Sequence, residues 1–255
     1  MGGASRNERR RRQQAAATTR KPSVDRVPGS GRKDNRVKVG IIVGIVIVVV
    51  FATIYVVLNR PWGSSQQVAA TYPVSADGVV VTAGQPGAPV TVDVYEDYLC
   101  PFCERFETRS ADALTAALNE GKVKVNYHAL NILDARTTPP GYSTLAANAA
   151  LCAVPAGIWP AYHKRLFADQ PAEGSAGMTA AQLSAIGTEL GAGPAFTQCV
   201  EGNGNAGAIS AATDAASANP ALQTDGQFGT PTIAVGGRKI DVSDSGWLQT
   251  ALAGS

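Results

Sequence analysis

A run of twenty uncharged residues constrains this chain more than any other feature. Residues 39–58 read VGIIVGIVIVVVFATIYVVL, in which only Thr53 and Tyr55 carry a polar side-chain group. Twenty residues of α-helix span about 30 Å, the thickness of the hydrocarbon core of a bilayer. β-Branched residues are poor helix formers in water, but in lipid a helix satisfies its backbone hydrogen bonds within one segment. The run therefore predicts a single transmembrane helix in contact with membrane lipid, with a buried helix of a soluble domain as the alternative.

The charges on the two sides of this run predict its orientation. Residues 1–38 hold twelve Lys or Arg and three Asp or Glu, whereas residues 39–255 hold ten Lys or Arg and seventeen Asp or Glu. Because basic flanks stay in the cytoplasm, we expect a single-pass protein of the cell membrane with its N-terminus inside and the rest outside. The run is longer than the apolar part of a usual signal peptide. An uncleaved anchor is therefore expected, and cleavage near Val68-Ala69-Ala70 is the alternative.

The basic tail, residues 1–38, has a composition typical of a disordered segment. It holds no aromatic residue and matches no nucleic-acid-binding module, so no nucleic acid partner is expected. A topology signal with some affinity for anionic lipid explains its charge more simply. After the predicted span, a turn-rich linker (59–74) leads to a domain at 75–255 that is long enough to bury a substantial core.

Local patterns divide this domain into two β-rich parts separated by an Ala- and Leu-rich region. In chain order they predict strands at 78–83 and 89–95, a helix ending near Gly121, a strand at 122–130, four or five short helices within 142–219, strands at 232–235 and 239–242, and a helix over 245–252. The first strand–helix–strand unit implies a right-handed parallel crossover. The domain is therefore expected to be α/β.

Cysteine usage indicates redox chemistry. All four cysteines follow the predicted span, on the side of the membrane where thiols are oxidised. Two of them form the motif Cys100-Pro101-Phe102-Cys103, at the junction between the strand at 89–95 and the following helix. The N–H groups and the dipole at a helix N-terminus stabilise a thiolate. Cys100 is therefore the predicted nucleophile, and Cys103 is close enough to resolve a mixed disulfide.

Two other uses of this motif are possible from the residues alone. A zinc site would need two more ligands, but the chain has no second CxxC and only two histidines, His128 and His163. We therefore expect no metal. An inert structural disulfide between Cys100 and Cys103 is the other alternative.

Three segments of the domain occur together in a characteristic order. They are Tyr95-Glu96-Asp97-Tyr98-Leu99, the CPFC motif, and Gly229-Thr230-Pro231-Thr232 before a strand. With the helical region between them, they resemble the DsbA-like thiol:disulfide oxidoreductases of the thioredoxin superfamily, in their membrane-anchored bacterial form. The resemblance implies a thioredoxin fold with an all-helical insertion at about 140–220. It also implies that Pro231 is a cis-proline facing the CxxC and that Thr230 offers backbone hydrogen bonds to an extended substrate.

Two positions depart from the pattern of that family. Strong oxidants often carry a His between the cysteines, where Phe102 has no hydrogen-bond donor, and this difference predicts a weaker oxidant. Many relatives carry an acidic residue six positions before the first cysteine, where this chain has Val94. Glu96 could accept a proton near Cys103 instead, but we expect it to be a solvated surface charge. Asp97 is expected to be a structural residue at the end of the strand.

The other two cysteines, Cys152 and Cys199, fall in predicted helices of the insertion. We expect them to bond to each other, with a second redox relay as the alternative. The expected substrate-binding residues, with Phe102 exposed beside Cys100, are Pro101, Phe102, Thr230 and Pro231. Among the remaining candidates, His128 is expected at a packing or rim position, and the expected core aromatic residues are Trp159, Tyr162 and Phe167.

These features predict a membrane-anchored, extracytoplasmic thiol:disulfide oxidoreductase that oxidises cysteine pairs of secreted proteins. Its substrates would be reduced or unfolded secreted proteins. The resemblance implies a quinone-linked membrane partner that reoxidises the CxxC, and no bound cofactor is needed. The same fold acting as a reductase or isomerase is the first alternative, because Phe102 lacks a donor. A non-catalytic envelope scaffold or binding module is the second.

Overall fold

The computed structural model describes residues 68–241 and 243–254. The predicted basic tail, the predicted transmembrane helix at 39–58 and residues 59–67 of the predicted linker lie outside this part of the chain. Within the described part, no helix combines the length and the apolar character needed to cross a membrane. The anchor therefore stays a prediction from the sequence.

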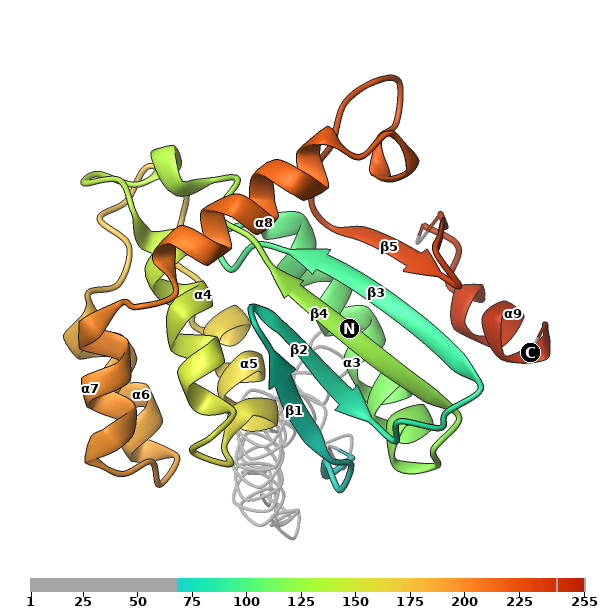
Figure 1. The fold of residues 1–255 in the computed structure, drawn as a ribbon, viewed down its shortest axis with the longest axis horizontal. Helices are drawn as coiled ribbons and strands as arrows, with labels where there is room; N and C mark the ends of the chain where they lie inside the picture. The colour runs from blue at the N-terminus through green and yellow to red at the C-terminus, as the bar shows by residue number, and fades with distance from the viewer. Residues whose placement is uncertain (1–67, 242, 255) are drawn as a thin grey trace, which may run out of the picture. The chain divides into compact units, whose positions relative to one another are not determined.

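A six-stranded sheet forms the centre of the domain, in the order β1-β2-β4-β3-β5-β6 (Figure 1). The strands are β1 (Val74–Asp77), β2 (Val80–Gly84), β3 (Val90–Glu96), β4 (Val123–Ala129), β5 (Thr232–Val235) and β6 (Arg238–Lys239). The central pair, β3 and β4, is parallel, as the predicted crossover requires, and the other neighbours are antiparallel. The α/β prediction is therefore confirmed.

The edges of the sheet differ from the sequence-based prediction. β1 was not predicted, and it begins in the segment predicted as a linker. Three of its four residues are exposed, so its sequence shows no alternation of apolar residues. At the other edge, β6 contains Arg238 and Lys239, and Ile240 N donates a further hydrogen bond to the Ile233 carbonyl of β5. The strand was predicted at 239–242, and residue 242 lies outside the described residues. Edge strands pair on one side only, so their sequences carry a weaker pattern than those of central strands.

Helices cover both faces of the sheet, and Figure 1 shows α3 (Pro101–Asn119) behind it and α8 (Ala206–Ala218) in front. α3 joins β3 to β4 and buries Phe106, Leu114 and Leu118. The ring of Phe106 meets that of Trp247 in the final helix, α9 (Trp247–Ala253), at a centroid distance of 6.0 Å. α8 packs on the other face, where Ala216 belongs to a second, smaller apolar cluster.

The region predicted as a helical insertion contains five α-helices between β4 and β5, and the short 3-10 helices Asp134–Arg136 and Pro220–Leu222 flank them. The α-helices are α4 (Tyr142–Ala153), α5 (Trp159–Ala168), α6 (Ala180–Glu189), α7 (Pro194–Gly202) and α8. A disulfide between Cys152 and Cys199 joins α4 to α7, with a Cα–Cα distance of 5.9 Å, and this is the pairing expected from the sequence. Trp159, Tyr162 and Phe167 of α5 are buried in the core, as predicted.

Candidate active site

The CxxC motif lies at the carboxyl end of β3, where the chain turns into α3. Asp97 holds this turn, because its carboxylate accepts hydrogen bonds from Leu99 N at 2.8 Å, Leu133 N at 2.9 Å and Ser143 Oγ at 2.7 Å. Burial raises the pKa of Asp97 to about 7, although these hydrogen bonds oppose the shift. Asp97 is therefore a structural residue, as its position at the strand end indicated.

Helix α3 begins directly after Cys100, with Pro101 at its first position. Proline is favoured there because the first N–H groups of a helix have no intrahelical partner. The carbonyl of Cys100 accepts hydrogen bonds from the N–H of Cys103 at 3.0 Å and of Glu104 at 3.2 Å. Gln170, which follows α5, donates from Nε2 to the carbonyl of Cys100 at 3.1 Å and so links the insertion to this loop.

Both cysteines of the motif are free thiols in this structure, and their environments differ. The Cys103 thiol donates a hydrogen bond to the Cys100 sulfur and lowers the pKa of Cys100 to about 6, against the opposing effect of burial. The Thr230 side chain and the N–H groups of Phe102 and Cys103 lower it further. Burial raises the pKa of Cys103 well above its ordinary value, and the nearby Cys100 adds to this effect. The geometry thus favours one nucleophilic and one protonated thiol.

A second segment, distant in sequence, faces Cys100. The Cys100 Sγ lies 3.2 Å from the carbonyl oxygen of Thr230, and the Thr230–Pro231 peptide bond is cis, the isomer that the family resemblance implied. On the other side of the motif, Phe102 is 64% exposed, as expected, and the Arg105 guanidinium lies 4.2 Å from the centre of its ring. The structure therefore brings together all the residues predicted from the CPFC and Thr-Pro segments.

One prediction about the site is wrong: Glu96 is not a solvated surface charge, since only 1% of it is exposed. β3 continues through Glu96, so this residue faces the same side of the sheet as Val90, Val92 and Val94, which are all buried. His163 Nε2 lies 2.8 Å from Glu96 Oε1. The alternation of β3 was the signal in the sequence that placed Glu96 inside.

Sequence reasoning also missed two buried residues near Glu96, which are its partner His163 of α5 and Glu107 of α3, the second carboxylate beside that histidine. His163 Nδ1 lies 4.0 Å from Glu107 Oε2. Both residues fall on the buried stripes of their helices, and this spacing was the only local signal for them. Glu96, Glu107 and His163 are called the buried trio below.

The electrostatics of the buried trio follow from its burial among aromatic rings. Burial raises the pKa of Glu107 to about 7, although the charge of His163 opposes the shift. Burial disfavours the charged imidazole, but the two carboxylates outweigh it and raise the pKa of His163. In the described part of the chain, this is the group of His, Cys, Asp or Glu side chains that lies close enough to hold a metal ion, with atoms within 4.8 Å. His163 Nε2 lies within hydrogen-bond distance of Glu96 Oε1, at 2.8 Å, whereas Nδ1 faces Glu107 Oε2 at 4.0 Å, which is an ion-pair distance.

The other histidine, His128 of β4, lies on the opposite face of the sheet from Glu96. It is partly buried, stacks on Tyr95 at a centroid distance of 4.2 Å, and places Nε2 3.2 Å from Asp93 Oδ1. This is the packing or rim position predicted for it.

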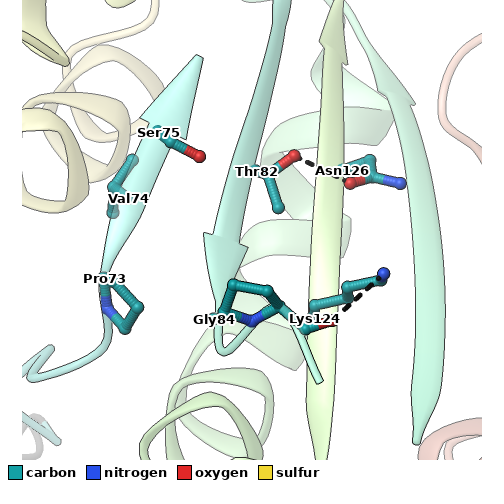
Figure 2. A pocket seen from close by; sticks show the side chains of 8 residues that line it. Pro73, Val74, Ser75, Thr82, Gly84, Lys124 and Asn126 are labelled. Atoms are coloured by element: carbon teal, nitrogen blue, oxygen red, sulfur yellow. Dashed lines mark hydrogen bonds between the residues drawn. The ribbon is translucent and has the colours of Figure 1, made fainter. Parts of the chain in front are cut away.

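A separate hollow of about 370 Å³ lies over β1, β2 and β4, and Figure 2 shows the side chains that line it. Within it, Thr82 Oγ1 donates a hydrogen bond to Asn126 Oδ1 at 2.9 Å, and Lys124 Nζ donates one to the Pro86 carbonyl at 3.4 Å. None of its lining residues belongs to the CxxC motif, the Thr230–Pro231 segment or the buried trio. The hollow is therefore distinct from the candidate active site.

The fold and the dithiol site define a thioredoxin-like protein, and comparison with known proteins agrees. A family model described as thioredoxin matches residues 77–252, so the chain belongs to the thioredoxin family. MdbA, a thiol-disulfide oxidoreductase from Corynebacterium diphtheriae, shares the fold with a TM-score of 0.61 at 21% identity, over 75% of this chain and 98% of that one.

Two structures from Mycobacterium tuberculosis are more similar in sequence. Reduced DsbA is 26% identical over 70% of this chain and 92% of its own, with a TM-score of 0.59. Reduced DsbG, a disulfide bond oxidoreductase, is 28% identical over 70% and 86%, with a TM-score of 0.59. Within its family, this chain is therefore similar to the DsbA-like proteins.

Another relative is named for a different activity. The serine/threonine-protein kinase PknE of M. tuberculosis strain H37Rv is 30% identical over 178 residues, which are 68% of this chain and 31% of the kinase. The chain thus spans about a third of the length of the curated relatives that it matches.

Proposed function

We propose that this chain is an extracytoplasmic oxidase that forms disulfide bonds in secreted proteins, with Cys100 and Cys103 as its catalytic pair. The observation that carries the proposal is the contrast between two neighbouring thiols. The pKa of Cys100 is lowered to about 6, whereas that of Cys103 is raised. A stabilised Cys100 thiolate favours the reduced dithiol, and a favoured reduced form makes the disulfide form a stronger oxidant.

The reaction would proceed by two thiol–disulfide exchanges. A substrate thiolate attacks Cys100 Sγ of the oxidised enzyme, the Cys100–Cys103 bond breaks, and Cys103 leaves with the electron pair and takes up a proton. The second substrate thiolate then attacks the substrate sulfur of the mixed disulfide, and Cys100 leaves as a thiolate. The substrate loses two electrons, and the enzyme gains them as a dithiol.

Substrate would bind as an extended segment between Phe102 and the Thr230–Pro231 loop. The Thr230 carbonyl lies 3.2 Å from Cys100 Sγ. The backbone of a substrate bound along the Thr230–Pro231 loop would therefore lie next to the reacting sulfur of Cys100. Exposed Phe102 adds apolar surface for unfolded chains, and Pro101 completes the contact surface. Cys152 and Cys199 stay outside the reaction, because their disulfide joins two helices of the insertion.

The location and partners rest on the sequence. Residues 1–38 would form a cytoplasmic tail, 39–58 the membrane anchor, 59–74 a linker and 75–255 the catalytic domain outside. A quinone-linked membrane partner would reoxidise the dithiol, and no bound cofactor takes part. The anchor would keep the catalytic domain near both this partner and proteins that emerge from the membrane.

A second candidate function, disulfide reduction or isomerisation, is favoured by Phe102. This residue offers no hydrogen-bond donor to the Cys100 thiolate, so the disulfide form would be a weaker oxidant than in relatives with His at this place.

The test is oxidative folding of reduced, unfolded ribonuclease A by the full chain in detergent. The oxidised chain should form about one mole of protein disulfide per mole of enzyme within minutes, and a Cys100→Ser variant should form none. Reduction of scrambled ribonuclease without net oxidation of the reduced form would support the second function instead. A chain inactive in both assays would act as a scaffold.

A further inference from the structure

We propose that Phe102, Arg105 and Arg109 of α3 form a surface that selects substrate segments with an acidic residue close to the reacting cysteine. These three residues are called the α3 stripe below. The inference rests on the proposed exchange at Cys100, and it names the class of substrate that the site would favour. It does not depend on whether the chain oxidises or reduces these substrates.

The α3 stripe begins inside the CxxC motif, at Phe102. Its three members follow one another at spacings of three and four residues, so their side chains lie along one face of the helix. All three are exposed, whereas the other face of α3 is buried in the core. Long side chains on a helix point toward its N-terminus, which is where Cys100 lies. The stripe therefore extends along the protein surface from the reacting cysteine.

The first two members of the stripe form one contact surface. The Arg105 guanidinium lies 4.2 Å from the centre of the Phe102 ring, which is within the range of a cation–π interaction. Phe102 is 64% exposed, and Val68 is the other large hydrophobic residue that is exposed in the described part of the chain. Aromatic residues and arginines contribute most of the binding energy in many protein interfaces. This pair is therefore suited to contact with another polypeptide.

The positive charge of the stripe is not neutralised within residues 68–241 and 243–254. There, Arg105 and Arg109 form no ion pair, and neither Glu104 nor Asp112 of the same helix lies within ion-pair distance of them. Glu104 instead accepts a hydrogen bond from Thr108 Oγ1 at 2.9 Å. A guanidinium that stacks on a ring keeps its in-plane N–H groups available, and these match the two oxygens of a carboxylate. The stripe is thus a positive surface on a domain that holds more acidic than basic residues.

A substrate that reacts with Cys100 would bring its own neighbouring residues to the stripe. The Thr230 carbonyl lies 3.2 Å from Cys100 Sγ, on the other side of the motif from Phe102. Residues two positions apart in an extended segment lie on the same face, about 7 Å from each other. Arg105 is five residues beyond Cys100, a rise of about 7.5 Å along α3, and its side chain extends back to Phe102. A carboxylate within two residues of the substrate cysteine would therefore reach Arg105, and a lysine there would be repelled.

The test measures how fast Cys100 captures three peptides that differ only at the two neighbours of a single cysteine, which are both Glu, both Gln or both Lys. Each peptide is otherwise uncharged and carries its cysteine as a mixed disulfide with thionitrobenzoate. The Cys100 thiolate attacks the peptide sulfur, a Cys100–peptide disulfide forms, and thionitrobenzoate leaves with the electron pair as a coloured anion. The full chain is used in a neutral detergent with Cys103→Ser in every sample, so that the captured peptide is not released.

At low salt we expect the Glu peptide to react about fivefold faster than the Lys peptide, with the Gln peptide between them. Arg105→Glu should reverse this order, whereas Arg105→Lys should keep it because the charge remains. Only the Glu-to-Lys rate ratio is compared between variants, so the intrinsic reactivity of each peptide cancels.

Arg238→Glu is the matched control, because it makes the same change in net charge far from the motif. Arg238 is an exposed arginine that pairs with Val235, at the end of β5 away from the CxxC. Its variant should keep the Glu-to-Lys rate ratio within about twofold. A ratio that Arg105→Glu leaves unchanged, or that Arg238→Glu changes as much, would overturn the inference.

A measurement with Arg105 in place avoids any loss of folding in a variant. The Glu-to-Lys rate ratio should fall toward one as sodium chloride is raised from about 0.01 M to about 1 M, because salt screens exposed charges. A ratio that salt does not change would contradict recognition by charge.

Two other occupants of the stripe would give different results, and either would overturn the inference. If anionic lipid covers the stripe, capture of the uncharged Gln peptide should slow in nanodiscs with phosphatidylglycerol and recover in Arg105→Glu. If a second copy of the chain covers it, Arg105→Glu should dissociate a dimer detected by light scattering.

These results separate the inference from the proposed function. Failure to oxidise ribonuclease, with the reversed peptide order in Arg105→Glu intact, would overturn only the proposed function. A Cys100 that captures none of the three peptides would overturn both.

Discussion

The disulfide between Cys152 and Cys199 provides a quantitative test of how the helical insertion is stabilised. It joins α4 to α7 across a sequence separation of 47 residues. In the chain-entropy model, closing a loop of this length lowers the entropy of the unfolded chain enough to stabilise the fold by about 4 kcal/mol. Both helices lie in the insertion, so the contribution should appear in the unfolding of the whole domain.

The perturbation is the double variant Cys152→Ala/Cys199→Ala, measured by urea unfolding of the full chain in detergent. We expect the free energy of unfolding to fall by about 4 kcal/mol and the melting temperature by about 8–16 °C. The control, Cys100→Ala/Cys103→Ala, also removes two cysteines. Their disulfide closes only a short loop, so the free energy of unfolding should fall by less in this variant. A loss below about 1 kcal/mol for the insertion variant would refute the reasoning from loop length.

Four further outcomes follow from the site and the core. Alkylation of Cys100 by iodoacetamide in the reduced chain should reach half its maximal rate near pH 6, because its pKa is lowered to about 6; a midpoint near the ordinary value of about 8.5 would contradict this. Phe102→His should raise the reduction potential of the pair, as measured against glutathione, since the imidazole adds a donor for the thiolate. Gly187→Ala should destabilise the domain to urea by about 1–3 kcal/mol, because its Cβ would overlap the Phe196 ring; unchanged stability would mean that the ring can move. Glu107 binds its proton more tightly in the fold, where its pKa is about 7, than in the unfolded chain. The free energy of unfolding should therefore fall as the pH rises from about 4 to 7, and Glu107→Gln should flatten this dependence in urea titrations.

Strong local patterns made the centre of the fold predictable. The strands β3 and β4 alternate regularly between buried and less buried residues. Both ends of each strand lie within two residues of the limits predicted from the sequence. The CPFC motif lies at the junction where its chemistry requires it. β1 was missed because an exposed edge strand has no buried face to shape its sequence.

The interior of the candidate site was less predictable because it depends on tertiary contacts. Glu96 and His163 are 67 residues apart, and neither has a local partner that would reveal the pair. Helical spacing placed His163 on a buried stripe, but spacing does not say which charges lie opposite it. Charged residues usually lie at the surface, and this tendency led to the wrong expectation for Glu96.

The most direct test of the proposed chemistry is the reduction potential of the Cys100–Cys103 pair in the full chain, measured by equilibration with glutathione. An oxidase with a stabilised Cys100 thiolate should have a potential above about −200 mV, within the range of known oxidants and isomerases. A potential below about −250 mV, close to that of thioredoxin, would contradict the oxidase function and favour a reductase.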